Sequence, residues 1–460
     1  MNRNYYSLSV GLLVFSLIVL LLMQNEFCSL DLSTLSNISI WLMCSALAIT
    51  FVRKKNIFSV SMIYLSVFSC FHFGMTLAFA FDLPMSEDIL HVYTNYWPKT
   101  EFVKEAIYLS TLGVMSLVLG FSFVKNKTPI NQNHFILQGY INKEDFKSRL
   151  ERCGFGILLG SILFWCYKTI SAGGVSLMVG SYSVFLEKTK DSGLSFLYYL
   201  IGFGLIMLLV AGKGLLVRVG IYVFAIFAIV GFPLGLRGEI LFPIAAALAV
   251  SSTTLVNVSK RKALVLVFIL LCAIGGVRVL RQAGVNDYRF SFQDFSPHNA
   301  LMEMGGQIWS VAEMCCWKNQ GEGELLGASF WAPFERGLYH FLPGMERLPA
   351  EQDERLLQLL LEQRVSAIGF SPIAEGYRNF GTLGVISVMI CIGFTVGLIE
   401  NMQKSLVAQA LSAVILFPLI IYIRNSFTPI PFQIAFGVII IMGNIYLSRK
   451  KAQYLYCNEM

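Results

Sequence analysis

Residues 215–258 read LLVRVGIYVFAIFAIVGFPLGLRGEILFPIAAALAVSSTTLVNV, and this stretch decides the class of fold. It holds two apolar runs, 215–235 and 240–258, and about twenty apolar residues suffice for a helix to cross the hydrocarbon core of a bilayer. The short turn between the runs carries Arg237 and Glu239. Backbone N–H and C=O groups cannot stay unpaired in lipid, so both runs are predicted to be membrane-spanning helices.

The rest of the chain repeats this pattern. Of its 460 residues, 56% are hydrophobic and only 14% are charged, whereas soluble proteins average about a quarter charged. We therefore predict an all-α polytopic membrane protein with about twelve transmembrane helices. The predicted spans are residues 5–23, 37–52, 57–80, 103–124, 153–171, 195–211, 215–235, 240–258, 263–280, 373–400, 405–423 and 429–447.

Basic residues gather between alternate spans, and this sets the predicted orientation. By the positive-inside rule, these loops and both chain termini face the cytoplasm. The net charge of +7 is accounted for by these anchors and by outward-facing arginines, so no nucleic-acid partner is expected. The anchors are Arg53-Lys54-Lys55, the segment from Lys125 to Arg152, Lys213 with Arg218, Lys260-Arg261-Lys262, Lys404 and Arg449-Lys450-Lys451.

The spans divide the chain into three predicted regions. Residues 1–280 form a membrane domain of about nine spans, residues 281–372 a large periplasmic loop containing short helices, and residues 373–460 a membrane domain of about three spans. Within the loop, leucines stand among charged residues from Glu351 to Val365. That pattern predicts an amphipathic helix lying on the lipid interface or over the site, with Asp353 on its surface.

The outward-facing segments from Arg237 to Arg424 carry arginine and almost no lysine, contrary to the usual bias of positive charge toward the cytoplasm. A guanidinium group presents a rigid fork of donors that matches phosphate and carboxylate groups. The pattern therefore indicates recognition of an anion. The arginines are Arg237, Arg278, Arg281, Arg289, Arg336, Arg347, Arg355, Arg364, Arg378 and Arg424.

Each of these arginines has two interpretations: it binds substrate, or it reaches lipid headgroups and pairs with nearby carboxylates. Local pairing is favoured for Arg355 and Arg364, and both interpretations stay open for Arg336 and Arg347. Substrate binding is favoured where the arginine lies beside glycine or at the end of a span, and four helices are expected to bring such groups to one depth. The arginines of this second kind are Arg237, Arg278, Arg281, Arg378 and Arg424.

A lipid-linked diphosphate fits such an arginine cluster. Negative charge grows on a diphosphate leaving group as its bond to a sugar breaks, and fixed cations stabilise that charge. The chain has no Asp-x-Asp pair and no nucleotide-binding motif, so no metal and no cofactor is expected. The reaction also needs a base for the acceptor hydroxyl, although a lone loop histidine is more often polar surface. The outward-facing candidates are His298, His340, Glu375, Glu239 and Glu335.

A short stretch at the start of the tenth span resembles a known family. Residues 375–384 read EGYRNFGTLG, which is similar to the pattern E-x-Y-x-N-F-G-x-x-G of the Wzy-type O-antigen and capsule repeat-unit polymerases. The turn Arg237-Gly238-Glu239 and the Gly173-Gly174 segment that leads to Tyr182 and Phe185 are similar as well. The predicted topology, about a dozen spans with one large late loop, also agrees with that family.

The resemblance implies a GT-C-like fold and a glycosyltransferase of the bacterial inner membrane that needs no metal. Such an enzyme transfers a glycan from undecaprenyl pyrophosphate to an incoming lipid-linked repeat unit on the outer face, which builds O-antigen, capsule or a related polysaccharide. It also implies a chain-length regulator and a flippase as partners. The motif positions with an implied catalytic or substrate-binding role are Glu375, Tyr377, Arg378, Asn379 and Arg237.

Two other functions stay open. An O-antigen ligase uses the same donor and differs in its acceptor. A flippase or other transporter of lipid-linked oligosaccharide is expected to show internal repeats and polar groups along a path at mid-bilayer. The middles of the predicted spans are nearly free of charge here, and the charges lie at one end, which favours chemistry at one face of the membrane.

Overall fold

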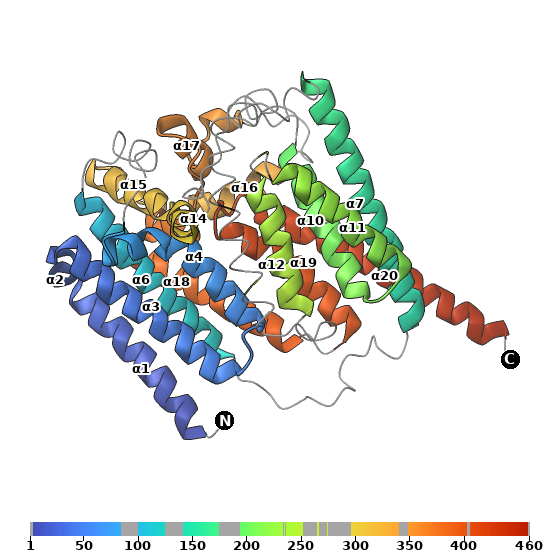
Figure 1. Ribbon diagram of the computed structural model, residues 1–460, viewed down its shortest axis with the longest axis horizontal. Helices are drawn as coiled ribbons and strands as arrows, with labels where there is room; N and C mark the ends of the chain where they lie inside the picture. Colours follow the sequence, from blue (N-terminus) through green and yellow to red (C-terminus); the bar gives the residue numbers. More distant parts are fainter. Residues whose placement is uncertain are drawn as a thin grey trace. The chain divides into compact units, whose positions relative to one another are not determined.

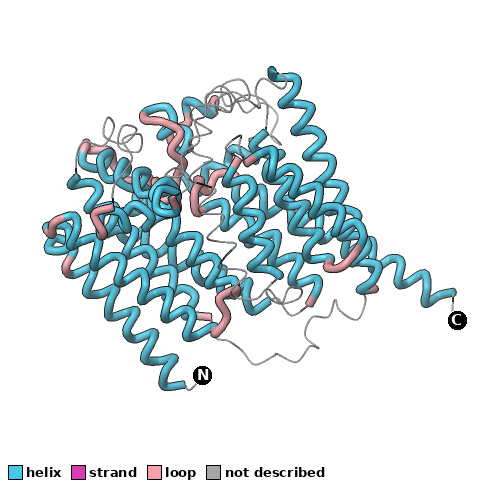
Figure 2. Tube along the Cα trace, in the orientation of Figure 1, coloured by secondary structure: helices cyan, strands magenta, loops and turns pink. Residues whose placement is uncertain are grey.

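The computed structural model of the chain is built from helices, and no strand occurs in the part that it describes (Figure 2). Eleven of the twelve predicted spans coincide with helices, whereas the run 263–280 lies almost entirely outside the described residues. The all-α fold is therefore confirmed, and the number of twelve spans stays a prediction. The described residues are 3–83, 100–124, 141–173, 194–232, 234, 236–251, 265, 274, 296–339, 348–402 and 405–458.

The longer helices follow the apolar runs. Six of them, α3, α4, α6, α7, α18 and α20, are long and apolar enough to cross a membrane by length and composition. The helices are α1 (Arg3–Leu22), α3 (Leu32–Lys54), α4 (Val60–Ala80), α6 (Thr100–Phe123), α7 (Lys143–Gly173), α10 (Leu194–Ala211), α11 (Leu215–Gly231), α12 (Arg237–Ser251), α18 (Pro372–Met402), α19 (Leu406–Tyr422) and α20 (Ile430–Asn458).

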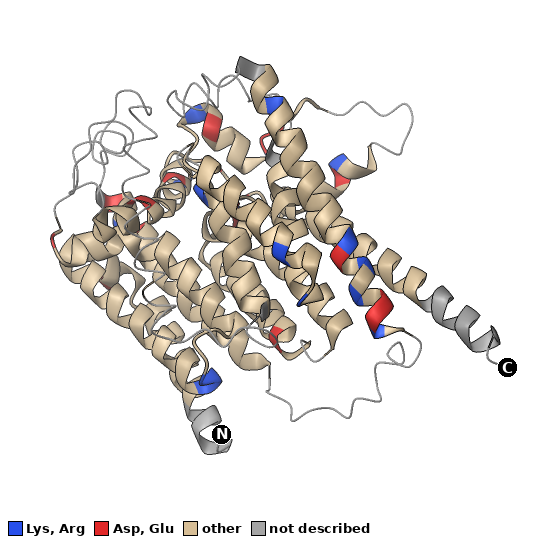
Figure 3. Cartoon of the chain, turned by 45° about the vertical axis from the view of Figure 1, so that its right-hand side comes forward, with Lys and Arg blue, Asp and Glu red and all other residues tan. Residues whose placement is uncertain are grey.

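Large apolar side chains lie on the outside of several of these helices. Trp41 on α3 and Ile229 on α11 expose 74% and 73% of their surface. Figure 3 shows that charged residues are sparse along the helices and gather toward their ends. Lipid solvates such a surface and water does not. The protein is accordingly a multi-pass membrane protein, while its orientation and the identity of the membrane stay predictions.

The chain folds as two compact units, and the first comprises Met1–Lys125, Leu301–Glu400 and Leu419–Phe432. Helix α6 packs against α1, α3 and α15 (Gln307–Asn319), and it is buried along almost its whole length (Figure 1). A Cβ atom added at Gly393 on α18 would lie 2.2 Å from the Leu117 carbonyl oxygen on α6. These two helices therefore touch backbone to backbone, as small residues permit in membrane proteins.

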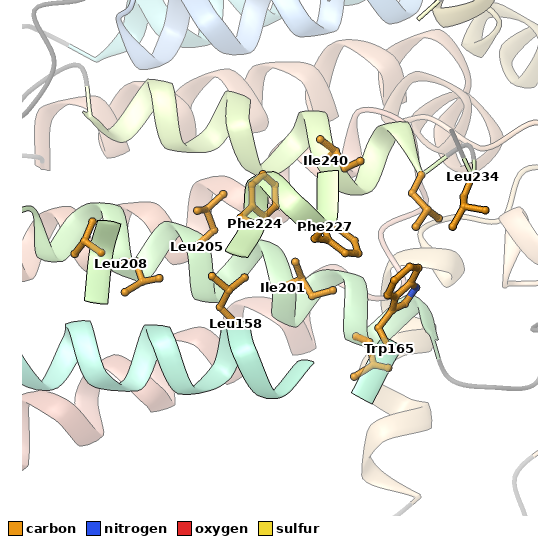
Figure 4. Packing of buried hydrophobic residues seen from close by; sticks show 12 residues of the cluster. Leu158, Trp165, Ile201, Leu205, Leu208, Phe224, Phe227, Leu234 and Ile240 are labelled. Atoms are coloured by element: carbon orange, nitrogen blue, oxygen red, sulfur yellow. The ribbon is translucent and has the colours of Figure 1, made fainter. Parts of the chain in front are cut away.

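The second unit comprises Asn126–Ala300, Asn401–Pro418 and Gln433–Met460. Helices α7 and α10 approach closely, since a Cβ atom added at Gly204 would lie 2.7 Å from the Leu158 backbone nitrogen. Their apolar side chains form a core with those of α11 and α12 (Figure 4). The core residues are Leu158, Trp165, Leu197, Ile201, Leu205, Leu208, Val217, Phe224, Phe227, Leu234, Leu236 and Ile240.

The region predicted as one large loop contains short helices, as expected. The predicted amphipathic helix is shorter than 351–365, because residues Ala350–Gln352 form a separate turn of 3₁₀ helix. Its Leu357 and Leu361 are buried against protein. The side of the membrane on which the region lies, and the division of the chain into three predicted regions, stay predictions. The short helices of this region are α14 (Pro297–Met304), α15, α16 (Ala328–Leu338), η4 (Ala350–Gln352) and α17 (Leu357–Arg364). A further short helix, α2 (Gln24–Ser29), follows α1.

Candidate functional site

The EGYRNFGTLG motif lies where α18 is interrupted, in the first unit. Phe380 and Gly381 leave helical geometry, and Gly381 has φ +60° and ψ −148°. The run that the sequence predicted as one continuous span is thus two helical segments. They pack tightly across the break, because a Cβ atom added at Gly384 would lie 2.0 Å from the Gly376 carbonyl oxygen. Only glycine adopts this backbone conformation and permits this approach.

Glu375 is buried in the first of these segments, with 1% of its surface exposed. One carboxylate oxygen accepts a hydrogen bond from the Ser329 hydroxyl at 3.0 Å. The other accepts from the Tyr422 hydroxyl at 3.2 Å and from the Phe427 backbone N–H at 2.8 Å. A buried carboxylate is tolerated only when its oxygens are hydrogen-bonded in this way. Glu375 therefore joins α18 to α16, to the end of α19 and to the segment between α19 and α20.

Asn379 completes this network and is fully buried. Its side-chain amide donates to the Ser329 hydroxyl and to the Glu375 carbonyl oxygen, each at 2.7 Å. Its side-chain oxygen accepts from the Gly327 backbone N–H at 3.0 Å. The predicted substrate-binding role of Asn379 stays untested, and its side chain already has partners within the protein.

Arg378 binds a glycine-rich loop, Gly321–Gly327, which we name the strap. The arginine donates to the Gly323 carbonyl oxygen at 2.5 Å and to the Glu322 carboxylate at 2.6 Å. In return, the backbone N–H groups of Leu325 and Leu326 donate to the carbonyl oxygens of Arg378 and Asn379. The interruption of α18 leaves these two carbonyl groups available, since helix-terminal carbonyls lack partners within the helix.

Tyr377 and Glu375 point to different partners although they belong to one helical segment. The Tyr377 hydroxyl donates to Glu105 on α6 at 2.7 Å. The Lys318 ammonium group lies 5.0 Å from the centre of the Tyr377 ring, within range of a cation–π contact. These contacts join α18 to α6 and α15. The role of Tyr377 in substrate binding stays a prediction.

Arg424 lies in the segment between α19 and α20, three residues before Phe427. The residue is half-buried, and its guanidinium group has neither a carboxylate nor a hydrogen-bond partner among the described residues. Its carbonyl oxygen accepts from the Phe370 backbone N–H at 3.0 Å, which places the segment beside the start of α18. Arg424 is therefore held close to the Glu375 network while its charge stays available.

Arg336 belongs to a second charged cluster, and the structure favours local pairing for it. It donates to the Asp353 carboxylate at 2.8 Å, and Arg355 bridges Asp353 and Glu335. Burial by itself raises the pKa of Asp353, but hydrogen bonds from Arg355 and Arg336 outweigh it and lower the pKa below its usual value. A hydrogen bond from Arg355 likewise lowers the pKa of Glu335. The expectation that Asp353 is a surface residue was wrong, because this ion pair buries it.

The local pairing expected for Arg355 and Arg364 is present. Arg364 forms an ion pair of 2.5 Å with Glu322 and lies over the Trp317 ring, 4.6 Å from its centre. Among the residues that the structure describes, no three His, Cys, Asp or Glu side chains are grouped to hold a metal ion.

Several predicted site residues belong to the second unit or lie outside the described residues. Arg237 is buried at the first position of α12, with the half-buried Glu239 two residues later. His298 on α14 is half-buried and hydrogen-bonds the Ser296 hydroxyl. The convergence of arginines from four helices stays a prediction. Outside the described residues lie Arg278, Arg281, Arg289, His340 and Arg347.

Sequence analysis did not single out three residues of this site, Ser329, Tyr422 and Glu322. A signal was available for Glu322, because Gly321 and Gly323 flank it and such glycines indicate a loop with unusual backbone angles. Ser329 and Tyr422 carry no such signal. Their roles depend on tertiary contacts with Glu375, which lies 46 and 47 residues away along the chain.

Comparison with known sequences tests the resemblance drawn from the motif. The family model described as "O-antigen polysaccharide polymerase Wzy" matches residues 366–451. The chain is similar to the O-antigen polymerases. The matched segment contains the whole EGYRNFGTLG motif and the segment that carries Arg424, so the polymerase resemblance is confirmed there.

A curated relative of this polymerase-like chain is "Protein CapE" of Staphylococcus aureus. The two are 26% identical over 197 residues, which make up 43% of each chain. The chain thus matches less than half the length of this relative. No solved structure matches the present chain.

The interrupted α18 leads to a first prediction, for Gly381→Ala. Alanine is strained at φ +60° and ψ −148°, so this variant is expected to lose about 1–3 kcal/mol of stability. The measurement is the thermal unfolding of the purified protein in detergent. Gly323→Ala is the matched control, because Gly323 has open space around it and an ordinary φ. Equal melting temperatures of Gly381→Ala and wild type would contradict the structural role of the break.

Proposed function

We propose that the protein is a glycosyltransferase that polymerises lipid-linked oligosaccharide repeat units into a surface polysaccharide. The observation that carries this proposal is the polymerase match over residues 366–451, two of whose motif residues, Glu375 and Asn379, meet in one buried network. Two arginines of that matched segment, Arg378 and Arg424, lie beside the network. The same segment thus supplies an organised scaffold and the cations that an anionic donor needs.

The proposed donor is a glycan on undecaprenyl pyrophosphate, and the reaction occurs at the outer face of the membrane. A hydroxyl group of the incoming repeat unit attacks the anomeric carbon of the donor glycan. The bond between that carbon and the phosphate oxygen breaks, a base takes the hydroxyl proton, and undecaprenyl pyrophosphate leaves. Arg378 and Arg424 stabilise the negative charge that grows on the leaving group. Arg237, Arg278 and Arg281 are proposed as further contacts to the same donor.

We assign Glu375 a positioning role in this reaction. Both of its oxygens already accept hydrogen bonds, and 1% of its surface is exposed. A general base needs an oxygen within reach of the acceptor hydroxyl, directly or through one water. Glu375 instead holds the segment that carries Arg424 against α18. His298, His340 and Glu239 stay as candidates for the base.

The surface glycan of a deletion strain tests the proposed function. We expect single repeat units attached to the cell surface and no long polymer, because only polymerisation is lost. Gel separation of the extracted polysaccharide, with detection of the carrier-linked intermediates, distinguishes the alternatives. Long polymer retained on the lipid carrier would indicate a ligase instead, and repeats retained on the cytoplasmic face would indicate a flippase.

A further inference from the structure

One carboxylate, that of Glu322, bridges two arginines from different helices. Its first oxygen lies 2.5 Å from Arg364 on α17, and its second lies 2.6 Å from Arg378 on α18. Charge-assisted contacts of this length are among the stronger hydrogen bonds in proteins. Two guanidinium groups therefore face one small anion, and here that anion belongs to the protein itself.

The anion site is built into the protein and is open on one side. The Arg378 side chain is about nine-tenths buried, whereas 28% of the Glu322 side chain and 37% of the Arg364 side chain are exposed. The Arg378 Nε–H is buried and has no hydrogen-bond partner in the described part of the chain. An unpaired buried donor is costly, so a further acceptor at this nitrogen would be stabilising.

The strap that carries Glu322 has the backbone features of a movable loop. Gly321 and Gly327 at its two ends have φ values of +92° and +90°. Its middle is exposed at Gly323 and Glu324. Backbone hydrogen bonds hold the strap at Glu322, Gly323, Leu325, Leu326 and Gly327. Its side chains are held by Arg364, by Arg378 and by an ion pair of 3.1 Å between Glu324 and Lys318. Rotation of the Glu322 side chain can withdraw its carboxylate while the backbone hydrogen bonds of the strap stay intact.

We propose that Glu322 is a latch on a diphosphate site formed by Arg364 and Arg378, and that a diphosphate group displaces it. A diphosphate carries more negative charge than a carboxylate and offers enough oxygens for both arginines and for the Arg378 Nε–H. This proposal rests on the proposed function, whose donor carries such a group. The proposal also gives Arg364 a role in binding the diphosphate. In the structure, the Glu322 carboxylate occupies the position that the diphosphate would take beside Arg364.

Calorimetric titration of the purified full chain in detergent with inorganic pyrophosphate tests the latch. Glu322→Gln keeps the size and the hydrogen-bonding atoms of the side chain but removes its charge. We expect it to bind pyrophosphate about tenfold more tightly than wild type, because the competing charge-assisted contact is weakened. Glu324→Gln is the matched control on the same strap, and its affinity is expected to equal that of wild type. Arg364→Gln is expected to lower the affinity in both backgrounds.

Two further ligands define the chemistry of the site. Farnesyl diphosphate should gain affinity in Glu322→Gln as pyrophosphate does, since the diphosphate group is shared, whereas orthophosphate should gain little. Equal or weaker pyrophosphate binding by Glu322→Gln, at an unchanged melting temperature, overturns the latch. An equal gain by Glu324→Gln overturns it too, because the effect would then be general electrostatics. These outcomes leave the proposed function standing, since the surface glycan of the deletion strain tests it separately.

Discussion

Arg378→Ala is expected to abolish long polymer while lipid-linked single repeats persist. The variant loses the contacts to the Gly323 carbonyl oxygen and the Glu322 carboxylate, and it removes a proposed cation from the diphosphate. Loss of one group that stabilises transition-state charge lowers turnover by roughly 10²–10³-fold. The measurement is the chain-length distribution of the surface polysaccharide in a deletion strain that expresses the variant.

A structural explanation of that loss must be separated from a chemical one. Breaking a buried ion pair costs about 3–5 kcal/mol, so the amount of folded Arg378→Ala protein in the membrane is measured first. Arg378→Lys keeps the charge without the fork and is expected to restore little polymer. Arg149→Ala is the control, because this arginine of the second unit forms an ordinary ion pair with Asp145 on the same helix. Polymer of normal length from well-expressed Arg378→Ala would contradict the proposed role of Arg378 in binding the diphosphate.

Glu375→Ala is expected to stop polymer formation because the network around the motif collapses. Removal of the carboxylate leaves three donors without an acceptor, namely the hydroxyl groups of Ser329 and Tyr422 and the N–H of Phe427. Each unsatisfied buried donor costs about 1–3 kcal/mol. Thermal unfolding in detergent and the polymer assay should therefore both show a large loss.

Glu375→Gln distinguishes a positioning role from proton transfer. The glutamine oxygen can accept from Tyr422 and Phe427, and its NH₂ group can donate to Ser329, whose hydroxyl can turn. If Glu375 positions the segment that carries Arg424, this variant should retain polymerisation within about tenfold of wild type. Loss of polymer from Glu375→Gln at a wild-type melting temperature would instead identify Glu375 as a base. Retention of full activity by Glu375→Ala would contradict both roles.

The positions of the helices could be predicted because a bilayer imposes a simple rule on sequence. An apolar run such as 215–235 must satisfy its backbone internally, so a helix is the expected structure, and α11 occupies Leu215–Gly231. The family resemblance was also accessible, since residues 375–384 carry a motif that needs no tertiary information. Orientation and the convergence of arginines depend on the membrane and on residues such as Arg278, which lies outside the described part.

The break at Gly381 shows where prediction from apolarity ended. Residues 373–400 were predicted as one apolar run, whereas the backbone dihedral angles of Phe380 and Gly381 are not helical. Hydropathy measures transfer into lipid and contains no information on φ. The surface position expected for Asp353 was wrong for a related reason, because a carboxylate is buried only when distant arginines such as Arg336 pair with it.

By itself, the sequence determined that this protein is a helical membrane protein, roughly where its helices lie, and that a polymerase-like motif begins one of them. These features are local, since they depend on runs of about twenty residues or on a short pattern. The tertiary structure decided which motif residues bind one another. It placed Ser329, Tyr422 and Phe427 around Glu375, and it set Glu322 between two arginines. Such pairings arise from long-range packing, where the cost of burying charge selects the partner.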